Sequence, residues 1–373
     1  MTKDQSVFFE LLRAGLWESE NREIRIDGTP DWDEVYRLAE EQSVLGLVAA
    51  GLDKLPPASR PPQEVLLQFI GAAMQIEQQN KAMNEFLSTL IDKLSNKDVY
   101  TLLVKGQGIA QCYEKPLWRS CGDIDLFLSE GNFAIAQKML LPIASSIEDE
   151  YAYTKHLGMT IDDWVVELHG SLRLGLSSRM DKVLDDIQKD TFYQGNVRSW
   201  LNGRSQVFML TPENDAAYVF THFLNHFYKE GLGIRQICDW CRLLWTYKDS
   251  LNHGLLESRI KKAGLMTEWR AFGAFAVEYL GMPVEAMPFY SADRKWKRKA
   301  DKICAFVMEV GNFGHNRDMS HFAKYPFVVR KCISMGRRIG DIINHAKIFP
   351  MSSLRFFPRI MYNGMVSAIK GEG

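Results

Sequence analysis

Apolar residues recur at helical spacing through the first 95 positions of the chain. Spacings of three and four residues place side chains on one helix face, and one such stripe is formed by Phe8, Leu11, Leu12 and Leu16. Asp31 is predicted to cap another helix, with Glu34 three residues later. A proline-rich linker then precedes a long helix predicted from about Pro62 to Asn96.

Strand-like runs replace this helical spacing from Val99 onward. In Asp123–Leu128 acidic and apolar residues alternate, and such alternation directs side chains to the two faces of a strand. Ser129 is predicted to cap a helix from Glu130 to about Leu141. The predicted strands are Val99–Val104, Asp123–Leu128, Tyr151–Leu157, Trp164–His169 and Val207–Leu210. Together they indicate a small mixed sheet.

The last part of the chain returns to a helical pattern. Thr211-Pro212-Glu213 is a strong helix start, because Thr caps, Pro fits the first helical position and an acid favours the first turn. That helix is predicted to end near Lys229, and a second covers Ile234–Lys248. We therefore predict an α+β protein in three parts: a helical N-terminal region (1–95), a central core (96–210) and a helical C-terminal domain (211–373).

The composition of the 373-residue chain, with 46% hydrophobic and 24% charged residues, is typical of a globular protein and excludes a largely disordered one. A net charge of −1 gives the whole molecule no bias toward nucleic acid. Charge is uneven, however, since residues 291–373 hold 16 Lys and Arg against 6 Asp and Glu. This region fits either an anionic partner (RNA, an anionic membrane face or an acidic acceptor) or a solvated helix face.

The cysteines and apolar runs indicate the compartment. Six cysteines are too few for a disulfide scaffold in a chain of this length, so reduced thiols are predicted. The first residues lack the basic and apolar segments of a secretory signal. Apolar runs such as Val44–Leu52 are far shorter than the ~20 residues that cross a bilayer. We therefore predict a cytoplasmic protein without a transmembrane segment.

The candidate chemistry centres on three acidic residues. Asp123 and Asp125 stand two apart on a predicted strand and therefore share one face. A divalent cation would relieve their repulsion, and Mg²⁺ favours a few carboxylates together with substrate phosphates. Glu167 is a lone acid within the apolar run Trp164–His169, where it needs a partner. A third metal-site carboxylate, acting as a base or as a ligand, would explain its place, and His169 shares its face.

The turn after the first predicted strand has the composition of a phosphate site. Gly106 and Gly108 would let backbone N–H groups approach a phosphate. Lys105 and Arg119 are cations that would lie near a triphosphate or, equally, form structural ion pairs with the aspartates.

Structural interpretations stand beside these functional ones. The two aspartates would alternatively cap a turn, and Glu167 would pair with Arg173 or Lys155. His169 would orient a ligand or merely bond a backbone carbonyl.

Two other polar pairs on predicted helices have the spacing of metal ligands. His222 and His226 stand at i, i+4, but the intervening residues lack the Glu base of a metalloprotease, so aromatic packing is predicted. Cys238 and Cys241 have no second cysteine pair to complete a zinc site, so buried thiols are predicted.

Several of these motifs together resemble a known family. The pattern Lys105-Gly106, Arg119, Gly122-Asp123-Ile-Asp125-Leu126 and Glu167-Leu-His169 is similar to that of uncharacterised bacterial nucleotidyltransferases of the DNA polymerase β superfamily. The segments Arg235–Asp239 and Gly311–Gly314 resemble the helical extension of that family. The resemblance covers most of the chain and is most specific over residues 102–169.

The resemblance implies a polymerase β-like core that moves a nucleoside monophosphate from an NTP to an acceptor hydroxyl or phosphate. By this resemblance, Asp123, Asp125 and Glu167 would bind two Mg²⁺ ions and would be the catalytic residues. The residues implied in nucleotide binding are Lys105, Gly106, Gln107, Arg119 and His169. The wider superfamily has Gly-Ser at the phosphate turn, where this chain has Gly106-Gln107. A catalytically inactive nucleotide-binding or protein-interaction regulator of the same fold is therefore the alternative.

Overall fold

The structure is a computed structural model that describes residues 1–18, 24, 26, 28–148, 153–229, 231–312 and 327–370. Its centre is a seven-stranded mixed sheet with the strand order β3-β4-β5-β2-β1-β7-β6. The strands are β1 (Leu102–Val104), β2 (Asp123–Phe127), β3 (Ser146–Ile147), β4 (His156–Ile161), β5 (Trp164–His169), β6 (Val197–Asn202) and β7 (Ser205–Leu210). β2 runs parallel to β5 and antiparallel to β1, so the sheet is mixed as predicted.

The alternating residues of β2 separate the two faces of the sheet. Ile124 and Leu126 are fully buried in a core that also contains Leu87 and Leu94 of helix α4 (Gln63–Ser95) and Phe133 of helix α6 (Glu130–Leu140). The opposite face, which carries the β2 aspartates, is covered by helix α5 (Gly106–Ala110) and the helices that follow the sheet. The predicted alternation of faces in this strand is confirmed.

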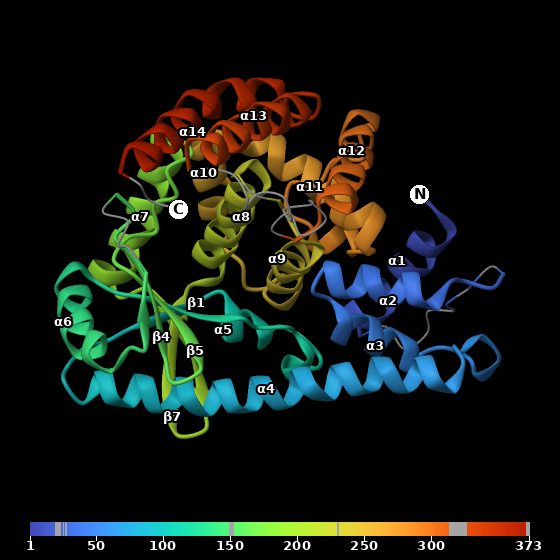
Figure 1. Cartoon of the computed structure of the whole chain (residues 1–373), viewed down its shortest axis with the longest axis horizontal. Coiled ribbons are helices and arrows are strands. Elements are labelled where there is room, and N and C mark those ends of the chain that lie inside the picture. Colours follow the sequence, from blue (N-terminus) through green and yellow to red (C-terminus); the bar gives the residue numbers. More distant parts are fainter. Residues whose placement is uncertain are drawn as a thin grey trace.

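Helix α4 connects the N-terminal helices to the sheet. It is 33 residues long, which corresponds to about 50 Å, and it runs beneath both parts of the molecule (Figure 1). Phe69 and Ala73 in its first half pack with α1 (Lys3–Leu16), α2 (Trp32–Glu41) and α3 (Leu45–Asp53). Its second half packs under the sheet. The helical N-terminal region is confirmed, whereas the division at residue 95 stays a prediction.

The helices that follow the sheet share one hydrophobic core with the N-terminal helices. Arg13 donates to the carbonyl oxygens of Glu278 and Tyr279, and Trp17 donates to that of Leu280. These bonds fix α1 to the end of α11 (Figure 1). The helices that follow β7 are α8 (Pro212–Lys229), α9 (Ile234–Thr246), α10 (His253–Ala263), α11 (Met266–Leu280), α12 (Arg294–Val310), α13 (Phe327–Ala346) and α14 (Pro350–Lys370). Helix α7 (Ser178–Gln194), which lies between β5 and β6 in the chain, packs into the same core.

Most element predictions are confirmed, and the misses are local. Asp31 caps α2 and Ser129 caps α6, as their side chains accept backbone N–H bonds there. The predicted strand Tyr151–Leu157 is wrong, because residues 153–155 form a turn and β4 starts at His156, while residues 151 and 152 lie outside the described residues. The predicted strand from Val99 is shorter and starts at Leu102. Strands β3 and β6 and helix α7 were not predicted.

No helix among the described residues is long and apolar enough to cross a bilayer. The structure describes the side chains of five cysteines, and all five are buried free thiols, including Cys238 and Cys241 on α9. The prediction that Cys238 and Cys241 are buried thiols on a helix is confirmed, and the reduced state of the cysteines stays a prediction.

The crossing of α1 and α3 provides a test of packing. A Cβ added to Gly51 would lie 2.0 Å from the carbonyl oxygen of Leu11, so the two helix backbones approach too closely for any side chain. We expect Gly51→Ala to lower the free energy of unfolding by about 1–3 kcal/mol, measured by urea denaturation. Gly71→Ala on α4 is the matched control, because its Cβ would meet nothing within 4 Å; it should stabilise by roughly 0.5–1 kcal/mol. Equal effects of the two changes would contradict this packing.

Candidate active site

The pairing of β2 with β5 brings three carboxylates together. Asp125 is paired with Glu167 in the parallel register, and residues opposite each other in a ladder point to the same face of a sheet. Asp123 lies two residues before Asp125 and shares that face. One oxygen of each of the three carboxylates lies within 4.8 Å of the others. The predicted common face of Asp123 and Asp125 is confirmed, and the strand pairing adds Glu167 to it, while the catalytic and metal-binding roles of the three stay predictions.

Asp125 is the buried member of the three. Its side chain is 1% exposed, and it accepts hydrogen bonds from Lys105 Nζ at 2.8 Å and from His169 Nε2 at 2.7 Å. Burial raises the pKa of Asp125, although the ammonium of Lys105 acts in the opposite direction. Its second oxygen, Oδ2, is buried without a hydrogen-bond partner among the described residues. This oxygen is an available metal ligand.

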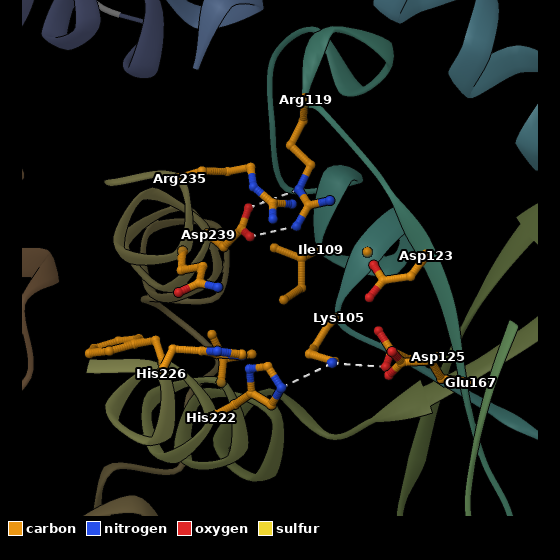
Figure 2. A pocket seen from close by; sticks show the side chains of 14 residues that line it. Lys105, Ile109, Arg119, Asp123, Asp125, Glu167, His222, His226, Arg235 and Asp239 are labelled. Carbon is orange, nitrogen blue, oxygen red and sulfur yellow. Dashed lines mark hydrogen bonds and ion pairs between the residues drawn. The ribbon is translucent and has the colours of Figure 1, made fainter. Parts of the chain in front are cut away.

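Lys105 enters the site through an unusual backbone conformation. Its φ of 60° and ψ of −148° lie outside the regions that L residues favour, which costs on the order of 1–3 kcal/mol. The side chain reaches both Asp125 and His222 on α8, with 3.0 Å between Lys105 Nζ and His222 Nε2 (Figure 2). Burial acts to lower the pKa of Lys105, but the carboxylates around it, Asp125 foremost, outweigh burial and raise it. Lys105 is therefore the charged counter-ion of the acidic cluster.

His222 accepts the hydrogen bond from this ammonium. Burial, reinforced by the charge of Lys105, holds the pKa of His222 well below its ordinary value, so its imidazole is neutral. The rings of His222 and His226 lie 4.6 Å apart and both line the cavity described below. The predicted aromatic packing is confirmed, but the sequence did not indicate that both histidines face the carboxylates.

Two histidines hold Glu167 in place. His156 on β4 is paired across the ladder with His169, and its Nε2 donates to Glu167 Oε2 at 3.0 Å. His169 Nε2 lies 3.4 Å from the same oxygen. Burial acts to raise the pKa of Glu167, but these hydrogen bonds outweigh it and lower the pKa, so the carboxylate stays ionised. The alternative partners proposed for Glu167 are wrong, because Arg173 pairs with Asp185 and Lys155 with Glu130.

The turn at the start of α5 offers its backbone rather than its Gln side chain. Gly106 has a φ of +46° and lines the cavity. The Gln107 side chain is buried and contacts Met83 of α4, so it points away from the cavity. The predicted role of Gln107 in nucleotide binding stays a prediction, and it would fall to the backbone of this residue.

Arg119 has a different partner from the one predicted. Lys105 forms the predicted ion pair with a β2 aspartate, Asp125. Arg119 instead binds Asp239 on α9, through Nε at 3.0 Å and Nη2 at 2.6 Å. Tyr113 donates to the same carboxylate at 2.8 Å. Burial acts to lower the pKa of Arg119, but Asp239 outweighs it and raises the pKa. This buried pair ties the loop before β2 to α9.

The cavity lies between the sheet and helices α8 and α9. It has a volume of about 300 Å³, and its lining includes Lys105, Asp123, Asp125 and Glu167 on one side. Figure 2 shows His222, His226, Arg235 and Asp239 facing them from the helices. Sequence reasoning gave no role to His156 or Arg235. The signals were weak: a misplaced strand boundary concealed His156, and Arg235 stood out only as the first residue of the segment Arg235–Asp239, which resembles the helical extension of the family.

A mixed sheet that brings three carboxylates to a cavity under a helical wall fits the class of nucleotidyltransferases. A family model described as "uncharacterised nucleotidyltransferase" matches residues 28–281, and the chain belongs to this family. The predicted family is thus confirmed, and membership of the wider polymerase β superfamily stays a prediction. Searches of curated proteins and of solved structures found no match.

The counter-ion role of Lys105 can be tested through metal affinity. Lys105→Met removes the positive charge that lies 2.8 Å from Asp125, so divalent cations should bind more tightly, by roughly tenfold, since removing a nearby charge is worth a few kcal/mol at most in this setting. Isothermal titration with Mn²⁺ measures the change. Lys155→Met, which removes an ion pair with exposed Glu130, is the control and should leave affinity unchanged. Weaker Mn²⁺ binding by Lys105→Met would contradict this role.

The hydrogen bonds of His169 predict a pH dependence. Burial acts to lower the pKa of His169, but Asp125 and Glu167 outweigh it and raise the pKa. The stabilising contribution is therefore complete below the ordinary value of ~6.5 and is lost as pH rises through the raised pKa. The loss of unfolding free energy in His169→Gln should be larger at about pH 5.5 than at about pH 9, measured without divalent cations. Exposed His253 provides the control variant His253→Gln, and a loss independent of pH would contradict the assignment.

Proposed function

We propose that the protein is a Mg²⁺-dependent nucleotidyltransferase that moves a nucleoside monophosphate from an NTP to an acceptor hydroxyl or phosphate. The observation that carries this proposal is the convergence of Asp123, Asp125 and Glu167 on one cavity in a chain of a nucleotidyltransferase family. In this reaction an acceptor oxygen forms a bond to the α-phosphorus, and the bond to pyrophosphate breaks. Nucleotidyl transfer of this kind depends mainly on positioning and charge stabilisation.

The donor set supports magnesium. Carboxylate oxygens are the ligands that Mg²⁺ prefers, and the unpartnered Oδ2 of buried Asp125 points to a missing ligand. Asp123, Asp125 and Glu167 would hold the metal, with two ions expected from the family resemblance. When bound, the metal would neutralise phosphate charge and orient the triphosphate.

The environment of Glu167 favours one of its two candidate roles. A base must accept a proton, but the hydrogen bonds from His156 and His169 lower the pKa of Glu167. A carboxylate that stays ionised is a good metal ligand and a weak base. We therefore assign Glu167 to metal binding, with His156 and His169 as positioning residues.

The chain's own residues would also contact the nucleotide and exclude water. Lys105 and Gly106 both line the cavity, where they would face phosphate oxygens. Arg119 is bound to Asp239, so it would shape the cavity more than bind phosphate. His169 is not among the residues that line the cavity and would act through Asp125 and Glu167.

The position of Gln107 favours the alternative, a regulator that binds a nucleotide without catalysis. Gln107 stands where the wider superfamily has Ser, and its side-chain amide is buried against Met83, so this residue presents no side-chain donor to a phosphate. A protein of this kind would bind a nucleotide without turning it over.

The acceptor, the cytoplasmic location and the anionic partner of residues 291–373 stay predictions. Arg294, Lys295, Lys297 and Arg298 are exposed on α12, which fits a solvated face equally well.

The test combines nucleotide binding with turnover. We expect NTPs with Mg²⁺ to raise the melting temperature, and radiolabelled NMP to appear on an acceptor when α-labelled NTPs are supplied with cell metabolites, RNA or the protein itself. Asp123→Asn and Asp125→Asn should reduce transfer by roughly 100-fold or more, because metal and substrate positions are lost. Asp185→Asn is the matched control, since Asp185 pairs with Arg173 outside the cavity.

The outcomes separate the two candidate functions. Transfer that needs both aspartates supports the enzyme. Nucleotide-dependent stabilisation without transfer supports the regulator. A protein that responds to no nucleotide, with or without Mg²⁺, would exclude the enzyme and the nucleotide-binding regulator.

A further inference from the structure

A positive charge without an acidic partner lies on the helical side of the cavity. Arg235 is the second residue of α9, lines the cavity, and donates from Nη1 to the carbonyl oxygen of Ser120 at 2.9 Å. Its Nε is buried and has no hydrogen-bond partner among the described residues. No carboxylate of the described residues forms an ion pair with it. A guanidinium in such a place is costly unless an anion joins it.

The nearest acid is already used. Both oxygens of Asp239 accept bonds from Arg119, and Tyr113 donates to one of them as well. Arg119 also donates to the carbonyl oxygen of Ser120, at 3.0 Å, so the two guanidinium groups share one acceptor and lie side by side (Figure 2). Arg119 and Arg235 thus lie beside a single carboxylate, that of Asp239, which bonds to Arg119. One positive charge is therefore in excess at this end of the cavity.

Another arginine of α9 shows what a structural guanidinium looks like in this protein. Arg242 is 3% exposed and donates to the carbonyl oxygens of Cys112 and Leu16 and to the carboxylate of Glu18. Its hydrogen-bonding capacity is thus used within the fold. Arg235, seven residues earlier on the same helix, has one protein acceptor and an open cavity before it.

We propose that Arg235 binds a phosphate group in the cavity, opposite Asp123, Asp125 and Glu167. The planar fork of a guanidinium matches two oxygens of a phosphate, and the excess charge beside Arg119 favours a dianion. The phosphate belongs either to the tail of the nucleoside triphosphate or to a phosphorylated acceptor. This assignment rests on the proposed function and adds a specific anion site to it.

The cavity is then polar at both ends. The acidic end would take the metal, and the end formed by Arg119 and Arg235 would take a phosphate that the metal does not reach. Ile109 lies between the two ends and contributes an apolar surface to the wall (Figure 2). A ligand that spans them must carry negative charge at a distance from its metal-bound part.

Isothermal titration of the full-length protein with Mg²⁺ and four probes tests the site: ATP, AMP, inorganic triphosphate and inorganic phosphate. We expect Arg235→Gln to weaken binding of the relevant phosphate probe by roughly 10- to 100-fold, as for the loss of a charge-assisted bidentate contact. Arg235→Lys, which keeps the charge but loses the fork, should fall between. Arg298→Gln on the exposed face of α12 is the matched control.

The probes distinguish the two sources of the phosphate. Weaker binding of ATP and inorganic triphosphate, with AMP unchanged, assigns Arg235 to the nucleotide tail. Weaker binding of inorganic phosphate alone, with ATP unchanged, assigns it to a phosphorylated acceptor. Unchanged binding of all probes that the wild type binds overturns the Arg235 site while leaving the proposed function intact. A wild type that binds none of them overturns both.

Thermal unfolding separates a binding role from a structural one. Removing a cation that has no acidic partner should leave the melting temperature of unliganded Arg235→Gln unchanged or raised. The stabilisation by ATP seen in the wild type should shrink in this variant. A large fall in melting temperature together with unchanged ligand binding would show that Arg235 is structural and would overturn the proposal.

Discussion

The parallel pairing of β2 with β5 is the constraint on which the rest of the site depends. It places Asp125 directly beside Glu167, with Asp123 two residues away on the same face. Like charges opposite each other in a sheet are destabilising, so the fold must supply compensation. It does so with Lys105 from the neighbouring strand end and with His156 and His169 from β4 and β5. The strained backbone of Lys105 is consistent with this need, because that conformation directs its ammonium to the buried carboxylate.

On the helical side of the cavity, charge is compensated by a buried ion pair. There a buried Arg119–Asp239 pair connects the loop before β2 to α9 and fixes the distance between sheet and helices. Breaking such a pair from one side is costly, because it leaves a buried charge alone. The pair thus connects the two sides of the cavity, while the Nε of Arg235 beside it has no acceptor among the described residues. One wall is rich in acceptors and the other in donors, which suits a ligand that carries both a metal ion and phosphate groups.

The N- and C-terminal helices hold the two sides of the cavity in place relative to each other. Helix α4 passes under both the N-terminal helices and the sheet, and α1 is bound to the end of α11 through Arg13 and Trp17. The N- and C-terminal helices therefore share a continuous core that packs on one face of the sheet (Figure 1). A catalytic site that works by positioning needs such a frame, since small displacements of reacting groups reduce rates strongly.

The sequence by itself determined most helices, the face on which Asp123 and Asp125 lie, and the family. These features depend on local periodicity, on capping residues such as Asp31 and Ser129, and on motifs that occupy contiguous positions. Only the tertiary structure decided the partners: Asp239 for Arg119, His156 for Glu167, and the side chain of Gln107 directed at Met83. It also brought Arg235 and His222 opposite the carboxylates. Such pairings join residues far apart in the chain, and the order in which strands and helices pack, which local patterns do not encode, determines which charges meet.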